Sequence, residues 1–147
     1  MANLPAPDET DETPPARRLD LPALVPGHRE VALVDASGET DTISHADAVE
    51  RLAQGLTPMV CHKPATARRL NTSPFPALDL LELFAFVRPA TFCRPTPSGL
   101  ADALDLPPPH GLGEEARLLQ IAGGVLLTDL LRMEAGRDRD LIAETAR

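Results

Sequence analysis

The chain has 147 residues, which is the size of one domain with one hydrophobic core. Its 14 basic and 22 acidic side chains give a formal charge of −8, and this acidic excess argues against a nucleic-acid-binding protein that relies on overall charge. No apolar run is long enough to span a membrane and the first residues lack a secretion signal, so we expect a cytoplasmic protein without membrane contact.

Residues 1–20 are rich in acidic residues and Pro, and they offer almost no large apolar side chain to bury. Ordering such a segment costs more conformational entropy than its contacts return. We therefore predict a disordered acidic tail over 1–20 and a folded domain over 21–135. Residues 136–147 are expected to be a linker or the start of a following segment, because they read like a helix that continues.

Two short segments predict a β-hairpin: the apolar run Glu30–Asp35 and its partner Thr40–Ile43, joined by a turn that contains Gly38. The acidic residues of this region, Asp35, Glu39 and Asp41, allow two interpretations. Carboxylates after a strand can hold divalent cations. The alternative is a turn that favours Asp, Ser, Gly and Glu for its backbone geometry.

Helices and short strands alternate in the next part of the chain. Ser44 is a helix N-cap and Gly55 ends that helix, after which we predict a strand at Pro58–Cys61 and a helix over Pro64–Leu70. The most hydrophobic segment, Leu78–Val87, predicts a central helix capped by Asp79.

Two further helices are predicted near the end of the chain, over Ser98–Leu104 and over Glu114–Glu134, and the pair Gly123 and Gly124 is suited to close packing in the second one. The sequence thus predicts an α/β domain with two or three short strands, four or five helices and Pro-rich loops. Cys61 and Cys93 are predicted to be free thiols.

Five basic residues are candidates for contact with nucleic-acid phosphates: Lys63, Arg68, Arg69, Arg88 and Arg94. The alternative is a solvated surface that balances the acidic excess. The sequence has no G-x-x-x-x-G-K-[ST] phosphate loop and no paired Cys and His spacing of a zinc site. We therefore expect neither ATP nor a metal ion to bind to this chain.

Three segments, VALVDASGE, PMVCHKPATARRL and ALDLLELFAFVRPATFCRPTPSGLADALDLPPP, follow one another in an order that resembles a proofreading-exonuclease domain of the RNase H-like class. The third segment is similar to the N-terminal region of alphaproteobacterial ATP-dependent DNA helicases of the DinG type. The resemblance covers about residues 22–132 and implies a small, degenerate exonuclease-like domain.

The exonuclease motifs themselves are mostly lost. That family carries Asp-x-Glu on its first strand and a second motif close to HNAxFD. Asp35 matches the first Asp while Ser37 replaces the Glu, and His62 matches the second motif while Lys63 replaces its Asn. The resemblance implies no catalytic residue and no metal ligand here, with Asp35, Glu39 and Asp79 as vestigial acidic positions.

The resemblance implies a non-catalytic accessory domain whose partners are DNA and the helicase motor domains. ATP, Mg²⁺ and, in many relatives, an iron–sulfur cluster belong to that motor region, which this chain lacks. Two alternatives remain open: a stand-alone protein-interaction module, and a residual metal-dependent nuclease that uses Asp35, Glu39 and Asp79. The reading frame beyond Arg147 is the first discriminator between the helicase and stand-alone interpretations.

Overall fold

The structure, a computed structural model, describes residues 18–145. The predicted acidic tail lies outside the described residues over 1–17. Five strands and five helices form an α/β domain, which confirms the predicted class and adds strands to it. The strands are β1 (Ala23–Pro26), β2 (Glu30–Val34), β3 (Thr40–Ser44), β4 (Met59–Val60) and β5 (Leu78–Asp79). The helices are α1 (His45–Ala53), α2 (Lys63–Leu70), α3 (Leu80–Val87), α4 (Pro97–Ala103) and α5 (Leu112–Thr145).

The five strands form one mixed sheet in the order β3-β2-β1-β4-β5. β2 pairs antiparallel with both of its neighbours, whereas β1 pairs parallel with β4 and β4 pairs parallel with β5. Only β2 therefore runs against the other four strands. β1, β2 and β3 form an antiparallel meander. The chain then reaches the parallel strands β4 and β5 through α1 and α2.

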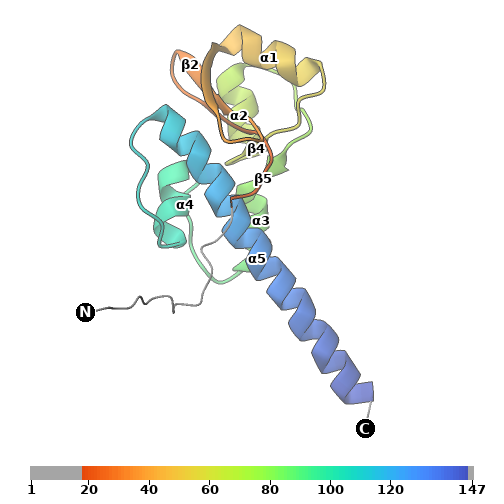
Figure 1. The fold of residues 1–147 in the computed structure, drawn as a ribbon. Helices are drawn as coiled ribbons and strands as arrows, with labels where there is room; N and C mark the ends of the chain where they lie inside the picture. Colours follow the sequence, from red (N-terminus) through yellow and green to blue (C-terminus); the bar gives the residue numbers. More distant parts are fainter. Residues whose placement is uncertain (1–17, 146–147) are drawn as a thin grey trace, which may run out of the picture.

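Helices cover both faces of the sheet, so the domain has three layers (Figure 1). Alternate residues of β1 point to opposite faces: Ala23 and Val25 join the core under α3, α4 and α5, and Leu24 joins the core under α1 and α2. Both cores are apolar, and each contains buried residues from the strands and from the helices above them. Each face of the sheet is thus stabilised by apolar side chains that are buried between its strands and the helices that cover it.

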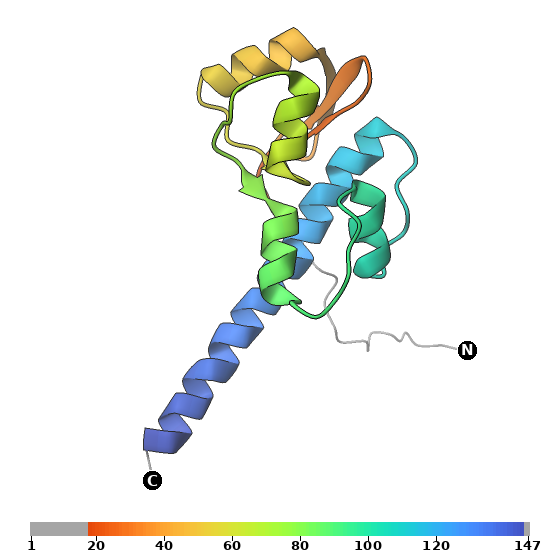
Figure 2. The ribbon, with the colours of Figure 1, turned by 180° about the vertical axis from the view of Figure 1, so that it is seen from behind.

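α5 is the longest element, and it crosses one face of the sheet and then projects beyond the domain (Figure 2). The predicted helix ends near Glu134, but α5 continues to Thr145. The prediction of close packing is confirmed at Gly123, since a Cβ at this position would lie 2.9 Å from Met59 Sδ. The missing side chain lets α5 lie directly on β4.

Two strands differ from the sequence prediction. β1 precedes the predicted hairpin, so the segment Glu30–Val34 is the second strand and not the opening one. β5 occupies Leu78–Asp79, where a helix is predicted to start, and α3 begins only at Leu80 with Asp79 as its N-cap. The predicted cap is confirmed.

α3 is less central than its composition predicts. Phe84 and Val87 are buried, but 60% of the Phe86 surface is exposed. Within residues 18–145 no helix combines the length and the apolar character that crossing a membrane requires.

Candidate functional site

A crevice of about 400 Å³ opens at the carboxyl ends of β1 and β4. Its walls come from five elements and one loop: the ends of β1 and β4, one face of α2, the segment before α4, and the first turns of α4 and α5. The volume lies within the range of pockets that hold small ligands, about 300–1,000 Å³. Its polar side chains include His62, Arg69, Thr96, Ser98 and Glu115.

The position of the crevice follows from the sheet topology. From β1 the chain moves to β2 on one side, and it later returns through α1 to place β4 on the other side of β1. Loops that follow two adjacent parallel strands then diverge and leave a gap between them. In open α/β sheets, ligands bind in such gaps at the carboxyl ends of the strands.

His62, which lines the crevice, forms a polar pair with the buried residue Asp79. His62 follows β4 and is the N-cap residue of α2, and its Nδ1 lies 3.4 Å from Asp79 Oδ2. The Asp79 carboxylate is buried and accepts hydrogen bonds from the backbone N–H of Lys63 (2.8 Å) and of Glu82 (3.0 Å). Asp79 therefore ties the start of α2 to the start of α3, which is a structural role.

Two further titratable groups line the crevice. Burial raises the pKa of the Glu115 carboxyl, which sits in the first turn of α5. Burial also raises the pKa of the Cys61 thiol to about 12, so this thiol is neutral at physiological pH. Cys61 and Cys93 are both free, as predicted.

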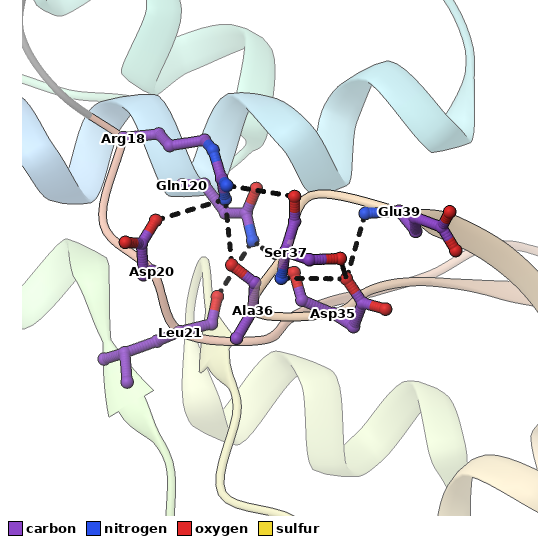
Figure 3. Close-up of polar contacts among 8 residues, drawn as sticks. All are labelled: Arg18, Asp20, Leu21, Asp35, Ala36, Ser37, Glu39 and Gln120. Carbon is purple, nitrogen blue, oxygen red and sulfur yellow. Dashed lines mark hydrogen bonds and ion pairs between the residues drawn. The ribbon is translucent and has the colours of Figure 1, made fainter.

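Asp35 holds the turn between β2 and β3 (Figure 3). Its Oδ1 accepts hydrogen bonds from the Ser37 hydroxyl (2.6 Å) and from the backbone N–H groups of Ser37 and Glu39 (both 2.9 Å). These bonds lower the pKa of Asp35, and the bond from the Ser37 hydroxyl has the largest effect. Asp35 thus has the turn-forming role that was one of the two interpretations of this acidic region.

The Arg18 side chain also contacts the turn between β2 and β3 (Figure 3). Its guanidinium donates to the carbonyl oxygens of Ala36 (3.1 Å) and Ser37 (2.9 Å), and it lies 3.3 Å from the Asp20 carboxylate. Arg18, which belongs to the predicted tail, therefore contacts the hairpin.

Gln120 connects α5 to this end of the sheet (Figure 3). Its buried side-chain Nε2 donates to the carbonyl oxygens of Leu21 and Asp35, both at 2.9 Å. The backbone N–H of Leu19 in turn donates to the Gln120 carbonyl at 2.8 Å. A buried polar side chain thus links α5 to β1 and to the hairpin.

The structure does not bring the three vestigial acidic positions together. Asp35 and Glu39 lie on the turn after β2, whereas Asp79 ends β5. Three strand spacings of about 4.8 Å separate β2 from β5, or about 14 Å across the sheet. Paired catalytic metals sit about 4 Å apart. Within the described part of the chain, no group of three or more His, Cys, Asp or Glu is arranged to hold a metal ion.

The five basic candidates occupy different places. Arg69 lines the crevice, while Lys63 and Arg94 are next in sequence to the lining residues His62 and Pro95. Arg68 is exposed on α2 and is not a lining residue.

Arg88, the last of the five basic candidates, forms an ion pair with an acidic side chain of α5. It donates to Asp129 on α5 at 2.7 Å, with about a third of its side chain exposed. This ion pair gives Arg88 a structural role in holding α3 against α5, away from the crevice walls.

Sequence reasoning missed Glu115 and the residues of β1 as crevice residues. Glu115 lies far along the chain from His62 and Arg69, and only the fold brings it to the crevice. The available signal was the pair of parallel-strand segments, since their carboxyl ends meet at one edge of a sheet.

No family model, curated protein or solved structure matches this chain. The likeness to the DinG-type region therefore stays a prediction from sequence motifs.

Proposed function

We propose that this chain is a non-catalytic RNase H-like accessory domain of a DinG-type ATP-dependent DNA helicase, and that its crevice holds single-stranded DNA. The observation that carries the proposal is the sheet. A five-stranded mixed sheet of order β3-β2-β1-β4-β5, in which only β2 is reversed, is the arrangement typical of the RNase H-like class. The crevice lies at the carboxyl ends of β1 and β4, which is where open α/β sheets bind ligands.

The side chains at that edge support a role without catalysis. The resembled exonucleases carry Asp-x-Glu on the first strand, whereas β1 reads Ala-Leu-Val-Pro. Among the described residues that line the crevice, Glu115 is the single carboxylate. Two-metal cleavage of a phosphodiester requires several carboxylates around two ions about 4 Å apart. We therefore assign binding, and not hydrolysis, to this crevice.

The basic side chains support DNA as the ligand. Arg69 lines the crevice, and its planar guanidinium suits bidentate contact with a phosphate. Lys63 and Arg94 are next in sequence to the lining residues His62 and Pro95. Because the chain as a whole carries a formal charge of −8, contact with DNA depends on this local patch and weakens as salt rises.

ATP hydrolysis is assigned to the motor domains of such a helicase. The chain has no Gly-rich phosphate loop of the G-x-x-x-x-G-K-[ST] type that cradles ATP with Mg²⁺. An iron–sulfur cluster belongs to the same motor region in the resembled helicases.

The proposal is tested by titrating the full chain into a fluorescein-labelled oligothymidine and measuring fluorescence anisotropy at 50 mM and 200 mM salt. The matched variants are Arg69→Ala, in the crevice wall, and Arg68→Ala, its exposed neighbour. We expect Arg69→Ala to weaken binding about tenfold, since one charge-assisted hydrogen bond contributes about 1.5 kcal/mol. Arg68→Ala should change it less than about twofold.

Two outcomes contradict the proposal. Equal losses in both variants would place the DNA elsewhere on the surface. Cleavage of the oligonucleotide by the wild-type chain with Mg²⁺ or Mn²⁺ would revive the residual nuclease, and loss of that cleavage in Asp35→Ala would assign it to the acidic turn.

A protein-interaction module is the second candidate, and exposed aromatic side chains favour it. Phe86 on α3 and Phe92 in the following loop are 60% and 83% exposed. Large apolar side chains in contact with water favour a protein partner. Binding to a protein partner that is lost in Phe92→Ser, together with no binding of oligothymidine by the wild-type chain, would support this candidate over the helicase accessory domain.

A further inference from the structure

We infer that His62 is a proton-controlled phosphate contact: when it is protonated, His62 and Arg69 together hold one phosphate group in the crevice. The inference rests on the proposed function where that phosphate belongs to DNA. It goes further by naming the group that is held and the side chain whose protonation controls its binding. The observations that carry it are the environment of the His62 ring and the charges around the crevice.

The two ring nitrogens of His62 have different surroundings. Nδ1 is buried and lies 3.4 Å from Asp79 Oδ2, in a geometry that does not complete a hydrogen bond. No hydrogen bond to Nε2 is formed within residues 18–145, and the side chain is 34% exposed and lines the crevice. One nitrogen thus faces a fixed carboxylate, and the other is available to a ligand.

This arrangement fixes the tautomer of the ring. A lone pair on Nδ1 would face the Asp79 carboxylate, which is unfavourable, so Nδ1 carries the proton. In the neutral ring Nε2 is then an acceptor and repels a phosphate oxygen. In the protonated ring Nε2 becomes a donor and can bind that oxygen.

The Asp79 charge strengthens the contrast between the two states. With His62 neutral, the carboxylate is an unbalanced negative charge beside the crevice, and it is held there by the backbone N–H groups of Lys63 and Glu82. With His62 protonated, the pair is neutral and no longer opposes an anion. Proton uptake therefore removes a repulsion and adds a donor at the same place.

Several other titratable groups lie around the crevice, and a test must separate them from His62. Arg69 and Lys63 on α2 and Arg94 before α4 are basic side chains that favour an anion. Cys61 after β4 stays neutral, because burial raises the pKa of its thiol to about 12. Glu115 on α5 is the competing group, since burial raises the pKa of its carboxyl, and a variant must separate it from His62.

The inference is tested on the full chain by NMR, following the Hε1 resonance of His62 from pH 5 to pH 8.5 at constant ionic strength. Three samples are compared: the protein alone, the protein with inorganic phosphate, and the protein with an unlabelled oligothymidine. Binding to the protonated form raises the titration midpoint by the logarithm of the affinity ratio. We expect the oligonucleotide to raise it by about one pH unit, which corresponds to binding about tenfold tighter at low pH.

Anisotropy titrations of three variants at pH 6 and pH 8 complete the test. His62→Gln keeps a polar side chain and should bind DNA equally at both values. Glu115→Gln should keep the wild-type dependence, as should His110→Gln, which replaces an exposed histidine away from Asp79. Circular dichroism of each variant confirms that it is folded.

Each outcome separates this inference from the proposed function. DNA binding that depends on Arg69 but leaves the His62 midpoint unmoved overturns the inference and leaves the function standing. A midpoint raised by inorganic phosphate and not by the oligonucleotide supports the phosphate site and removes DNA as its source. A pH dependence that persists in His62→Gln and disappears in Glu115→Gln assigns the control to Glu115 and overturns the inference.

Discussion

Gly123 sets how closely α5 approaches the sheet. A Cβ at this position would lie 2.9 Å from Met59 Sδ and 3.3 Å from Leu19 Cδ2. Met59 is fully buried, so it cannot move without disturbing the core. We expect Gly123→Ala to lower the free energy of unfolding by about 1–3 kcal/mol through overpacking.

The matched control lies on the same helix. A Cβ at Gly136 would meet nothing within 4 Å, so Gly136→Ala should raise the free energy of unfolding by up to about 1 kcal/mol through helix propensity. Urea denaturation of both variants measures the difference. Equal effects of the two substitutions would show that contact with Met59 does not limit the packing of α5.

Asp35 makes the stability of the hairpin turn depend on pH. Hydrogen bonds from Ser37 and Glu39 lower its pKa below 3.8, so its contribution is present above that value and is lost as pH falls through the lowered pKa. Asp35→Ala should therefore have a lower urea midpoint than wild type at pH 7. The difference should shrink towards pH 2, and a difference that stays constant would contradict this role.

The ion pair between Arg88 and Asp129 joins two elements, α3 and α5. The pair is short, at 2.7 Å, but both side chains are partly exposed. We expect Arg88→Ala to lower the free energy of unfolding by about 0.5–1 kcal/mol and to leave oligonucleotide affinity unchanged. A selective loss of DNA binding would return Arg88 to the nucleic-acid-binding residues.

The projecting part of α5 has a different stability from the part that lies on the sheet. Ala116, Leu119, Ala122 and Leu126 are fully buried, whereas nearly all described side chains beyond Met133 are exposed. A short helical segment without tertiary contacts is only marginally stable in water. We expect backbone amides of residues 134–140 to exchange hydrogen on the order of a hundredfold faster than those of 116–126. Equal protection would indicate a partner for this segment.

Local signals predicted most elements. The hairpin, the Ser44 cap of α1 and the Asp79 cap of α3 follow from short-range chemistry, and the structure confirms each one. β1 and β5 were missed because β1 ends in Pro26 and β5 is only the first two residues of an apolar segment that continues as α3, and both strands are stable only through pairing with their neighbours. Element length and sequence periodicity carry no information about such pairing.

At the scale of the whole molecule, the crevice could be predicted only in part. His62 and Arg69 share one sequence segment, so local reasoning finds them, but Glu115 and the end of β1 reach the same place only through the tertiary fold. The assignment of Asp35 to the opening strand was wrong for the same reason. β1 was not recognised, so the strand that precedes Asp35 is the second strand of the chain and not the first.

The most direct test of the account is the affinity of oligothymidine for the wild-type chain, for Arg69→Ala and for Arg68→Ala, measured by anisotropy at 50 mM salt. The account predicts binding that weakens at 200 mM salt, falls about tenfold in Arg69→Ala and stays within about twofold in Arg68→Ala. No binding by the wild-type chain, or equal losses in the two variants, would contradict it.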